Sequence, residues 1–150
     1  MEPVPDDQDR RGLSLLFKEP ARLIVFILLA LLMMKAGAWQ VVRVLVQTGH
    51  GDFDLFGVEA RIVIESIPRY TFSVLGVAYL VLTGLATIAL ALRRRITLVF
   101  LLGASLVHLV IWTRVASNPF QPGWPGVLFM NEEVLAIVLL VDMARRDRLY

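Results

Sequence analysis

The sequence contains no cysteine among its 150 residues. This absence excludes disulfide bonds, thiolate metal sites and cysteine nucleophiles within the chain. Histidine is almost as scarce, with only His50 and His108. Because His108 alone falls within a long apolar run, bis-histidine ligation of a haem is excluded as well. The chain also lacks a phosphate-binding loop and a nucleophile constellation, which argues against an enzyme.

Charged residues are few, at 19%, whereas 57% of the residues are hydrophobic. A mean hydropathy of +0.70 is too high for an ordinary soluble domain of this length. A membrane-spanning helix needs about 20 apolar residues, and the sequence offers four such runs, approximately 21–46, 70–92, 96–115 and 126–144. We therefore predict an all-α integral membrane protein. Its single domain, 1–150, would be an antiparallel bundle of four transmembrane helices after a tail at 1–20.

The basic residues predict the orientation of these spans, because cytoplasmic loops collect Lys and Arg near span ends. On one side lie ten: Arg10, Arg11, Lys18, Arg22, Arg93, Arg94, Arg95, Arg145, Arg146 and Arg148. On the other side lie Arg61, Arg69 and Arg114, with Arg43 near the end of the first span. The pattern predicts a multi-pass protein of the cytoplasmic (inner) membrane with both termini in the cytoplasm. It explains the net charge of +2 by topology, and we expect no nucleic-acid partner.

A polar layer is predicted inside the membrane. Counting from the arginine at the cytoplasmic end of each span, Lys35, His108 and Glu132 each lie 13 residues inward and Tyr79 lies 14. At 1.5 Å per residue, all are about 20 Å from the inner boundary. Glu133 adjoins Glu132. A charge within a span is usually paired or exposed to a cavity, so we predict that Lys35 pairs with one of the two glutamates, beside the other members of the layer.

Other polar and aromatic residues have simpler interpretations. Gly76, Tyr79, Thr83 and Thr87 share one helical face, which is typical of helix packing in membranes. Trp39 and Trp112 fall one turn beyond the polar layer, as in an interfacial aromatic belt. We predict two outer loops. The first, 47–69, would hold a short surface helix near its Val58–Ile67 stretch, and the second, 117–126, would be an extended proline-containing segment. His50, Asp52 and Asp54 indicate a solvated turn, and we predict no metal site.

The topology, the spacing from Arg22 to Lys35 and the basic turn Arg93–Arg95 together resemble the DoxX-like family of small four-span proteins. The resemblance covers residues 20–38 and that turn, and the second span lacks the acidic residue expected from the family. It implies a membrane module associated with quinone-linked redox chemistry.

Two functional hypotheses follow. The sequence favours a non-enzymatic accessory or scaffold subunit of a larger membrane complex. In such a protein Lys35, Tyr79, His108 and Glu132 or Glu133 form a structural lock, without a cofactor, and the partners are lipid, other membrane subunits or further copies of the chain. The alternative is a DoxX-like module that binds a quinone or another small ligand at the same layer. An enclosed pocket opening at the layer would favour the alternative, and a dry, fully paired layer would favour the lock.

Overall fold

The computed structural model describes residues 19–116, 118–120, 124–146 and 149. Nearly all of the predicted 1–20 tail, and part of the 117–126 loop, lie outside these residues. The elements are α2 (Pro20–Gln47), β1 (Asp54–Leu55), β2 (Val58–Glu59), α3 (Ala60–Glu65), η1 (Thr71–Leu75), α4 (Gly76–Ala91), α5 (Ile96–Val115) and α6 (Trp124–Arg145).

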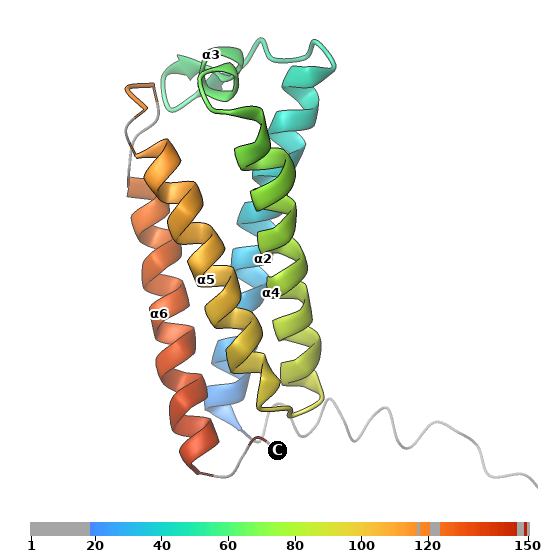
Figure 1. Ribbon diagram of the computed structural model, residues 1–150, viewed down its shortest axis with the longest axis vertical. Coiled ribbons are helices and arrows are strands. Elements are labelled where there is room, and N and C mark those ends of the chain that lie inside the picture. The colour runs from blue at the N-terminus through green and yellow to red at the C-terminus, as the bar shows by residue number, and fades with distance from the viewer. Residues whose placement is uncertain (1–18, 117, 121–123, 147–148, 150) are drawn as a thin grey trace, which may run out of the picture.

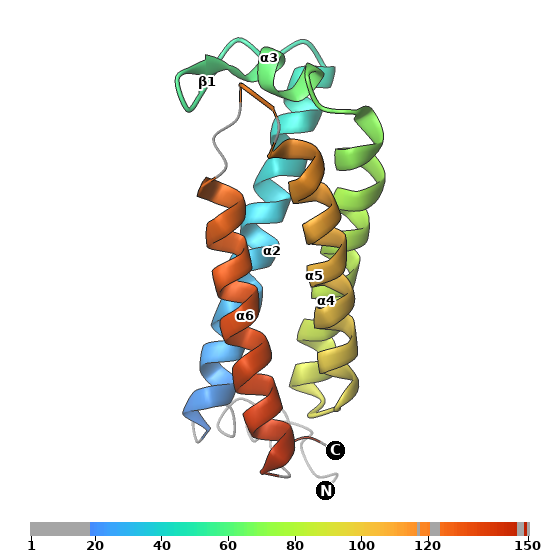
Figure 2. The ribbon, with the colours of Figure 1, turned by 60° about the vertical axis from the view of Figure 1, so that its left-hand side comes forward.

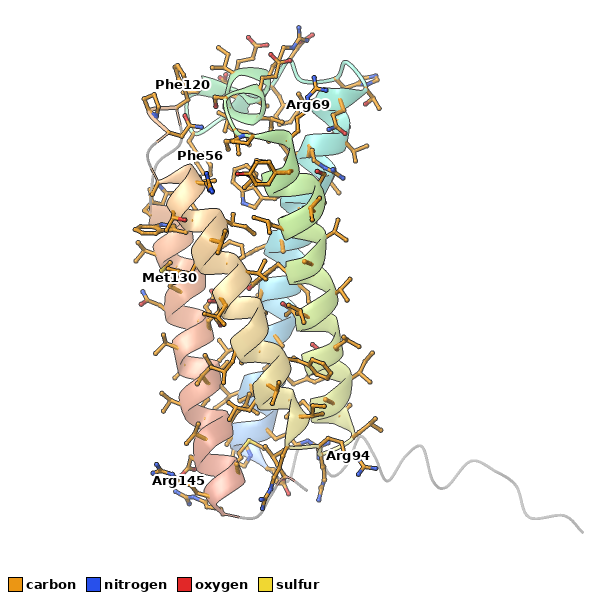
Figure 3. The ribbon with its side chains drawn as sticks, viewed as in Figure 1. Phe56, Arg69, Arg94, Phe120, Met130 and Arg145 are labelled. Carbon is orange, nitrogen blue, oxygen red and sulfur yellow. The ribbon has the colours of Figure 1, made fainter. Side chains whose placement is uncertain are left out.

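The four long helical segments in the described part of the chain lie side by side (Figure 1). Helix α4 packs against α2 and α5, and α6 also packs against α2 and α5. Each helix therefore has two neighbours and runs antiparallel to both, as the rotated view also shows (Figure 2). We call the end that carries α3 and β1–β2 the cap end, and the end with Arg94 and Arg145 the arginine end (Figure 3).

The helix ends follow local sequence signals. Helix α2 begins at Pro20, where the missing N–H costs nothing. Helix α4 ends in a Schellman motif: the Arg93 N–H donates to Leu90 and the Arg94 N–H to Ala89, with Arg93 in the left-handed region at φ 57°. This tight turn makes α4 and α5 antiparallel neighbours, as the short basic loop predicts.

In the part of the chain that the structure describes, three helical stretches are long and apolar enough to cross a membrane: Pro20–Gln47, Thr71–Ala91 and Ile96–Val115. They confirm an all-α membrane protein and three of the four predicted apolar runs. The fourth run forms α6, which has 22 residues. Because α6 contains Glu132, Glu133 and Asp142, its hydropathy is lower.

The outer surface of the helices is apolar. Met34, Val99 and Leu106 are among the most exposed side chains, at 64%, 64% and 66%. Soluble proteins rarely expose apolar surface so extensively. The surface is that expected of helices surrounded by lipid.

The arginine-end half of the interior is a tightly packed apolar core. Its fully buried side chains include Leu29, Leu32, Leu90, Leu101 and Leu140. Gly76, Tyr79 and Thr83 form the buried face of α4, and Thr87 is partly buried beside them, which confirms the predicted packing stripe. Polar interior side chains other than Arg22 and the threonines therefore concentrate toward the cap end.

The cap contains a β-hairpin that the sequence pattern does not predict. β1 and β2 pair antiparallel, with Asp54 opposite Glu59 and Leu55 opposite Val58. The two turn residues, Phe56 and Gly57, have φ of 57° and 84°, as a two-residue hairpin turn requires. The predicted surface helix is α3, which is shorter than its apolar pattern. Asp52 pairs with Arg61 at 2.7 Å, and no metal-binding cluster of His, Cys, Asp or Glu occurs among the described residues.

Arg22 is not a headgroup-facing arginine but a buried one, only 3% exposed. Its guanidinium donates hydrogen bonds to the carbonyls of Leu90 and Ala91, at 3.0 and 2.7 Å. These carbonyls belong to the last turn of α4, where carbonyls lack the usual partner four residues on; that of Leu90 also accepts the Arg93 N–H. Arg22 therefore ties the start of α2 to the end of α4.

We predict that Arg22→Met lowers the free energy of unfolding by about 1.5–3 kcal/mol, the usual value of hydrogen bonds from a charged donor. Chemical unfolding in lipid bicelles measures this. Arg94→Met is the matched control, because Arg94 is exposed at the same end, and it should change stability by less than about 0.5 kcal/mol. Equal losses in the two variants would show that Arg22 acts through net charge and not through the α4 carbonyls.

Candidate functional site

The structure brings together all five residues of the predicted polar layer, and it divides them into two groups. In the first, the Lys35 ammonium on α2 forms a salt bridge and hydrogen bond with Oε1 of Glu132 on α6. The ammonium also lies 5.4 Å from the centre of the Phe129 ring, within cation–π range. The side chains of Lys35 and Glu132 remain 31% and 22% exposed, so this pair lies at the edge of the helix bundle.

The second group is fully interior. Glu133 is 3% exposed, and its Oε1 accepts a hydrogen bond from the Tyr79 hydroxyl at 2.8 Å. The Nδ1 of His108 lies 3.0 Å from the same oxygen without the alignment of a hydrogen bond. Tyr79 and His108 face one another with ring centres 5.6 Å apart. Successive helical residues point about 100° apart, so the adjacent glutamates serve different groups.

A cavity adjoins the second group on the cap side. The volume of the cavity is about 80 Å³. This is several times the roughly 10–15 Å³ that one water molecule requires on the same measure. All four long helical segments contribute to its wall. Its lining residues include Trp39, Gln40, Phe72, Gly76, Tyr79, His108, Trp112, Gly126 and Phe129.

Aromatic rings form part of the walls, beside aliphatic side chains such as Ile111 and Val115. Trp39 and Phe72 stack with ring centres 5.8 Å apart and planes at 15°. Phe129 lies 5.2 Å from His108 and 6.4 Å from Tyr79, measured between ring centres. Such surfaces favour a flat molecule, because ring faces pack against each other over a large area.

Besides Nδ1 of His108, two polar atoms of the lining side chains have no hydrogen-bond partner among the described residues. They are Oε1 of Gln40 and Nε1 of Trp112, and both are buried. The Gln40 Nε2 donates to the Phe72 carbonyl at 3.0 Å. A carbonyl only accepts, which assigns the amide orientation and leaves Oε1 as the open acceptor. An unpaired buried polar group costs about 1–3 kcal/mol, so both atoms favour a partner supplied from the cavity.

Two glycines make room for these polar side chains. A Cβ on Gly76 would lie 2.2 Å from Nε2 of Gln40, and a Cβ on Gly126 would lie 2.1 Å from Cδ1 of Trp112. No larger residue fits either position without displacing its neighbour. Gly76 follows the π-helical segment η1, and such segments are frequent at functional sites.

Of the cavity residues, Gly76, Tyr79 and His108 were identified from sequence patterns, whereas the uncharged residues beside them were not recognised as part of a site. Gln40 and Phe72 have no distinguishing pattern, and Trp39 and Trp112 were interpreted as an interfacial belt. Both tryptophans line the cavity. Spacing was the available signal: Trp112 lies one turn after His108 and Gln40 lies five residues after Lys35, which places Gln40 and Trp112 near one depth, about one turn beyond the polar layer.

Comparisons with known proteins supply no relative. No protein-family model matches the chain, and neither curated proteins nor solved structures give a match. The resemblance to the DoxX-like family therefore receives no support from these comparisons, and the functional argument depends on the cavity itself.

Proposed function

We propose that this protein is a four-span membrane protein that binds a small, flat, hydroxyl-bearing ring in the cavity between its helices. A hydroquinone headgroup is the chemical class that fits best. The observation that carries the proposal is the aromatic cavity next to the polar cluster, with an unpaired acceptor on Gln40 and an unpaired donor on Trp112 at its walls.

The fourth span of this proposal is α6. Its outward side chains Val127, Leu128, Val134, Leu135 and Val138 are 47–60% exposed, and water would disfavour such a face. Asn131 is the polar exception on that face. The carboxylate of Glu133 is buried, and that of Glu132 is paired with Lys35, which is how intramembrane charges are accommodated.

The proposed orientation has the arginine end in the cytoplasm of a cell with an inner membrane. Arg93, Arg94, Arg145 and Arg146 all lie at that end, in agreement with the excess of Lys and Arg that short cytoplasmic loops carry. The cavity would then lie in the outer half of the bilayer, and the apolar core of the arginine-end half would separate it from the cytoplasm.

The ligand should be a hydroxyl compound and not a dione. Trp112 Nε1–H can only donate and Gln40 Oε1 can only accept. A hydroxyl group satisfies either atom, whereas a ring carbonyl satisfies Trp112 alone. Both atoms are covered in the present conformation, and the cavity volume of about 80 Å³ is below the roughly 150 Å³ of a cavity that binds benzene. Ligand binding therefore requires side-chain rotations that uncover the two atoms and enlarge the cavity, and such rotations are common on binding.

We predict that the protein in phosphatidylcholine nanodiscs binds the reduced form of ubiquinone-0, which has no tail, about tenfold more tightly than the oxidised form, the value of one hydrogen bond to a buried acceptor. Anaerobic titration of tryptophan fluorescence measures both affinities. Gln40→Leu should remove the difference between the two forms. Gln47→Leu is the matched control, because Gln47 is exposed at the end of the same helix, and it should preserve the difference.

Two results would contradict this proposal. The first is the absence of saturable binding of either form to the wild-type protein. The second is an unchanged preference for the reduced form in Gln40→Leu, which would place the ligand elsewhere.

The accessory-subunit hypothesis remains the second candidate function, since the pairing of Lys35 with Glu132 and of Tyr79 with Glu133 is what a structural lock requires. It proposes other membrane subunits or further copies of the chain as partners. Purification from native membranes in a mild detergent, followed by mass determination of the intact assembly, tests it. A monomer without protein partners would remove this candidate and leave the cavity proposal in place.

A further inference from the structure

A second, larger hollow lies beside the cavity, between α2 and α6. It measures about 310 Å³ and is the more open of the two. We call it the α2–α6 groove. Its lining residues are Lys35, Ala38, Trp39, Val42, Leu55, Phe56, Trp124, Pro125, Leu128 and Phe129.

The groove and the cavity share a wall. Trp39, Pro125 and Phe129 line both. A molecule whose ring occupies the cavity can therefore extend past these three side chains into the groove. The shared wall distinguishes the groove from an unrelated surface depression.

The lining of the groove calls for an apolar occupant. Lys35 is the only charged residue among the described residues that line it, and the ammonium is already neutralised by Glu132, so no anion is required. The remaining side chains are apolar or aromatic. Leu128, on its wall, is 47% exposed on the apolar outer surface, so the groove opens toward the region that lipid tails would occupy.

Phe56, which lines the groove at the cap end, has an unfavourable backbone conformation. Phe56 has φ 57°, a backbone region that bulky residues rarely adopt. Its ring lies 6.3 Å from that of Trp39 and 5.6 Å from that of Trp124, between centres. Asparagine or glycine would adopt this turn conformation at a lower cost. We infer that the contacts of the Phe56 ring offset the cost of its backbone conformation.

We propose that the ligand is an amphiphile whose apolar tail lies in the α2–α6 groove while its ring occupies the cavity. This inference rests on the proposed function and adds the class of ligand: a membrane-dissolved ring compound with a hydrocarbon tail, which reaches the cavity sideways from the bilayer and not from water.

The test compares two probes, reduced ubiquinone-0 and reduced decylubiquinone, which differ in the tail. The tail also raises partitioning into lipid. The measured quantity is therefore the gain from the tail, which is the ratio of the decylubiquinone affinity to the ubiquinone-0 affinity, compared between variants in the same phosphatidylcholine nanodiscs. Ala38→Phe fills the groove from an exposed position, and Ala30→Phe makes the same change on an exposed position of α2 outside the groove.

The gain from the tail should fall by about tenfold in Ala38→Phe, which corresponds to two methylenes excluded from burial. It should stay at the wild-type value in Ala30→Phe, and the affinity for ubiquinone-0 should be unchanged in both variants. If ubiquinone-0 binds and the gain is equal in the two variants, the tail does not occupy the groove. If ubiquinone-0 does not bind the wild-type protein, the proposed function itself is wrong and this inference fails with it.

Discussion

Replacing Lys35 with methionine should lower the free energy of unfolding by about 2.5–3.5 kcal/mol, the insertion-scale value for an unpaired charge near the middle of a span. The reason is the Glu132 carboxylate, which loses its ion pair and has a second oxygen, Oε2, that is buried without a hydrogen-bond partner among the described residues. Glu132→Gln should cost a similar amount by leaving the ammonium unpaired. Reversible unfolding in bicelles measures both losses.

The double variant Lys35→Met, Glu132→Gln shows whether Lys35 and Glu132 stabilise the protein through their ion pair or independently of each other. It should be less destabilised than the sum of the single variants by about 1–3 kcal/mol, the range for directly interacting residues. The control pair is Asp142 and Arg146, which lie 3.0 Å apart with side chains 47% and 61% exposed. Asp142→Asn and Arg146→Met should couple by only about 0.3–0.5 kcal/mol.

Strict additivity at Lys35 and Glu132 would contradict the pairing. It is the result expected if the lysine stem extends to the headgroups and keeps its ammonium in water. In that case the polar layer would not lock α2 to α6, and the contacts of Glu133 with Tyr79 and His108 would be all that remains of that layer among the described residues.

The sequence could predict the parts of this fold that depend on long patterns. Apolar runs of about 20 residues locate the helices because the length requirement of a bilayer is strict. Depth counting groups Lys35 with Glu132 because α-helices rise uniformly along their length. What depth cannot give is rotation about each helix axis, and rotation is what assigns Glu132 to Lys35 and Glu133 to Tyr79.

The cavity could not be predicted for a related reason. It exists where side chains from four helical segments fail to fill the interior, and that depends on packing between residues far apart in the chain. Gly76 and Gly126 look like ordinary helix glycines in the sequence. The fold brings Gln40 against Gly76 and Trp112 against Gly126. The role of each glycine is to leave room for that side chain, and this role is visible only in the structure. The hairpin at Phe56 was missed because its strands have only two residues each.

Replacing Gly126 with alanine should abolish the cavity and reduce binding of reduced ubiquinone-0 by at least about tenfold. The added Cβ would lie 2.1 Å from Cδ1 and 2.6 Å from Nε1 of Trp112, so the indole must move. Overpacking of this kind costs about 1–3 kcal/mol. The backbone of α6 cannot yield without disturbing Phe129 and Glu133, which leaves the cavity as the space available to the displaced ring.

The matched control is Gly84→Ala in α4, where the nearest atom to an added Cβ is the terminal methyl of Met33 at 3.8 Å. This substitution meets no clash and replaces a helix glycine, so it should stabilise the protein by about 0.5–1 kcal/mol and leave binding unchanged. Thermal unfolding and the fluorescence titration, applied to both variants, separate a general effect of alanine in a helix from the contact with Trp112.

A second substitution keeps the prediction decisive if Gly126→Ala folds poorly. Trp112→Phe removes the larger ring, so the double variant Gly126→Ala, Trp112→Phe should recover most of the lost stability. It should not recover the affinity of the wild-type protein for the reduced probe, because phenylalanine has no N–H to donate. Full recovery of binding in the double variant would show that Trp112 fills space beside the ligand without holding it, and the hydrogen-bonding role proposed for the indole would then be wrong.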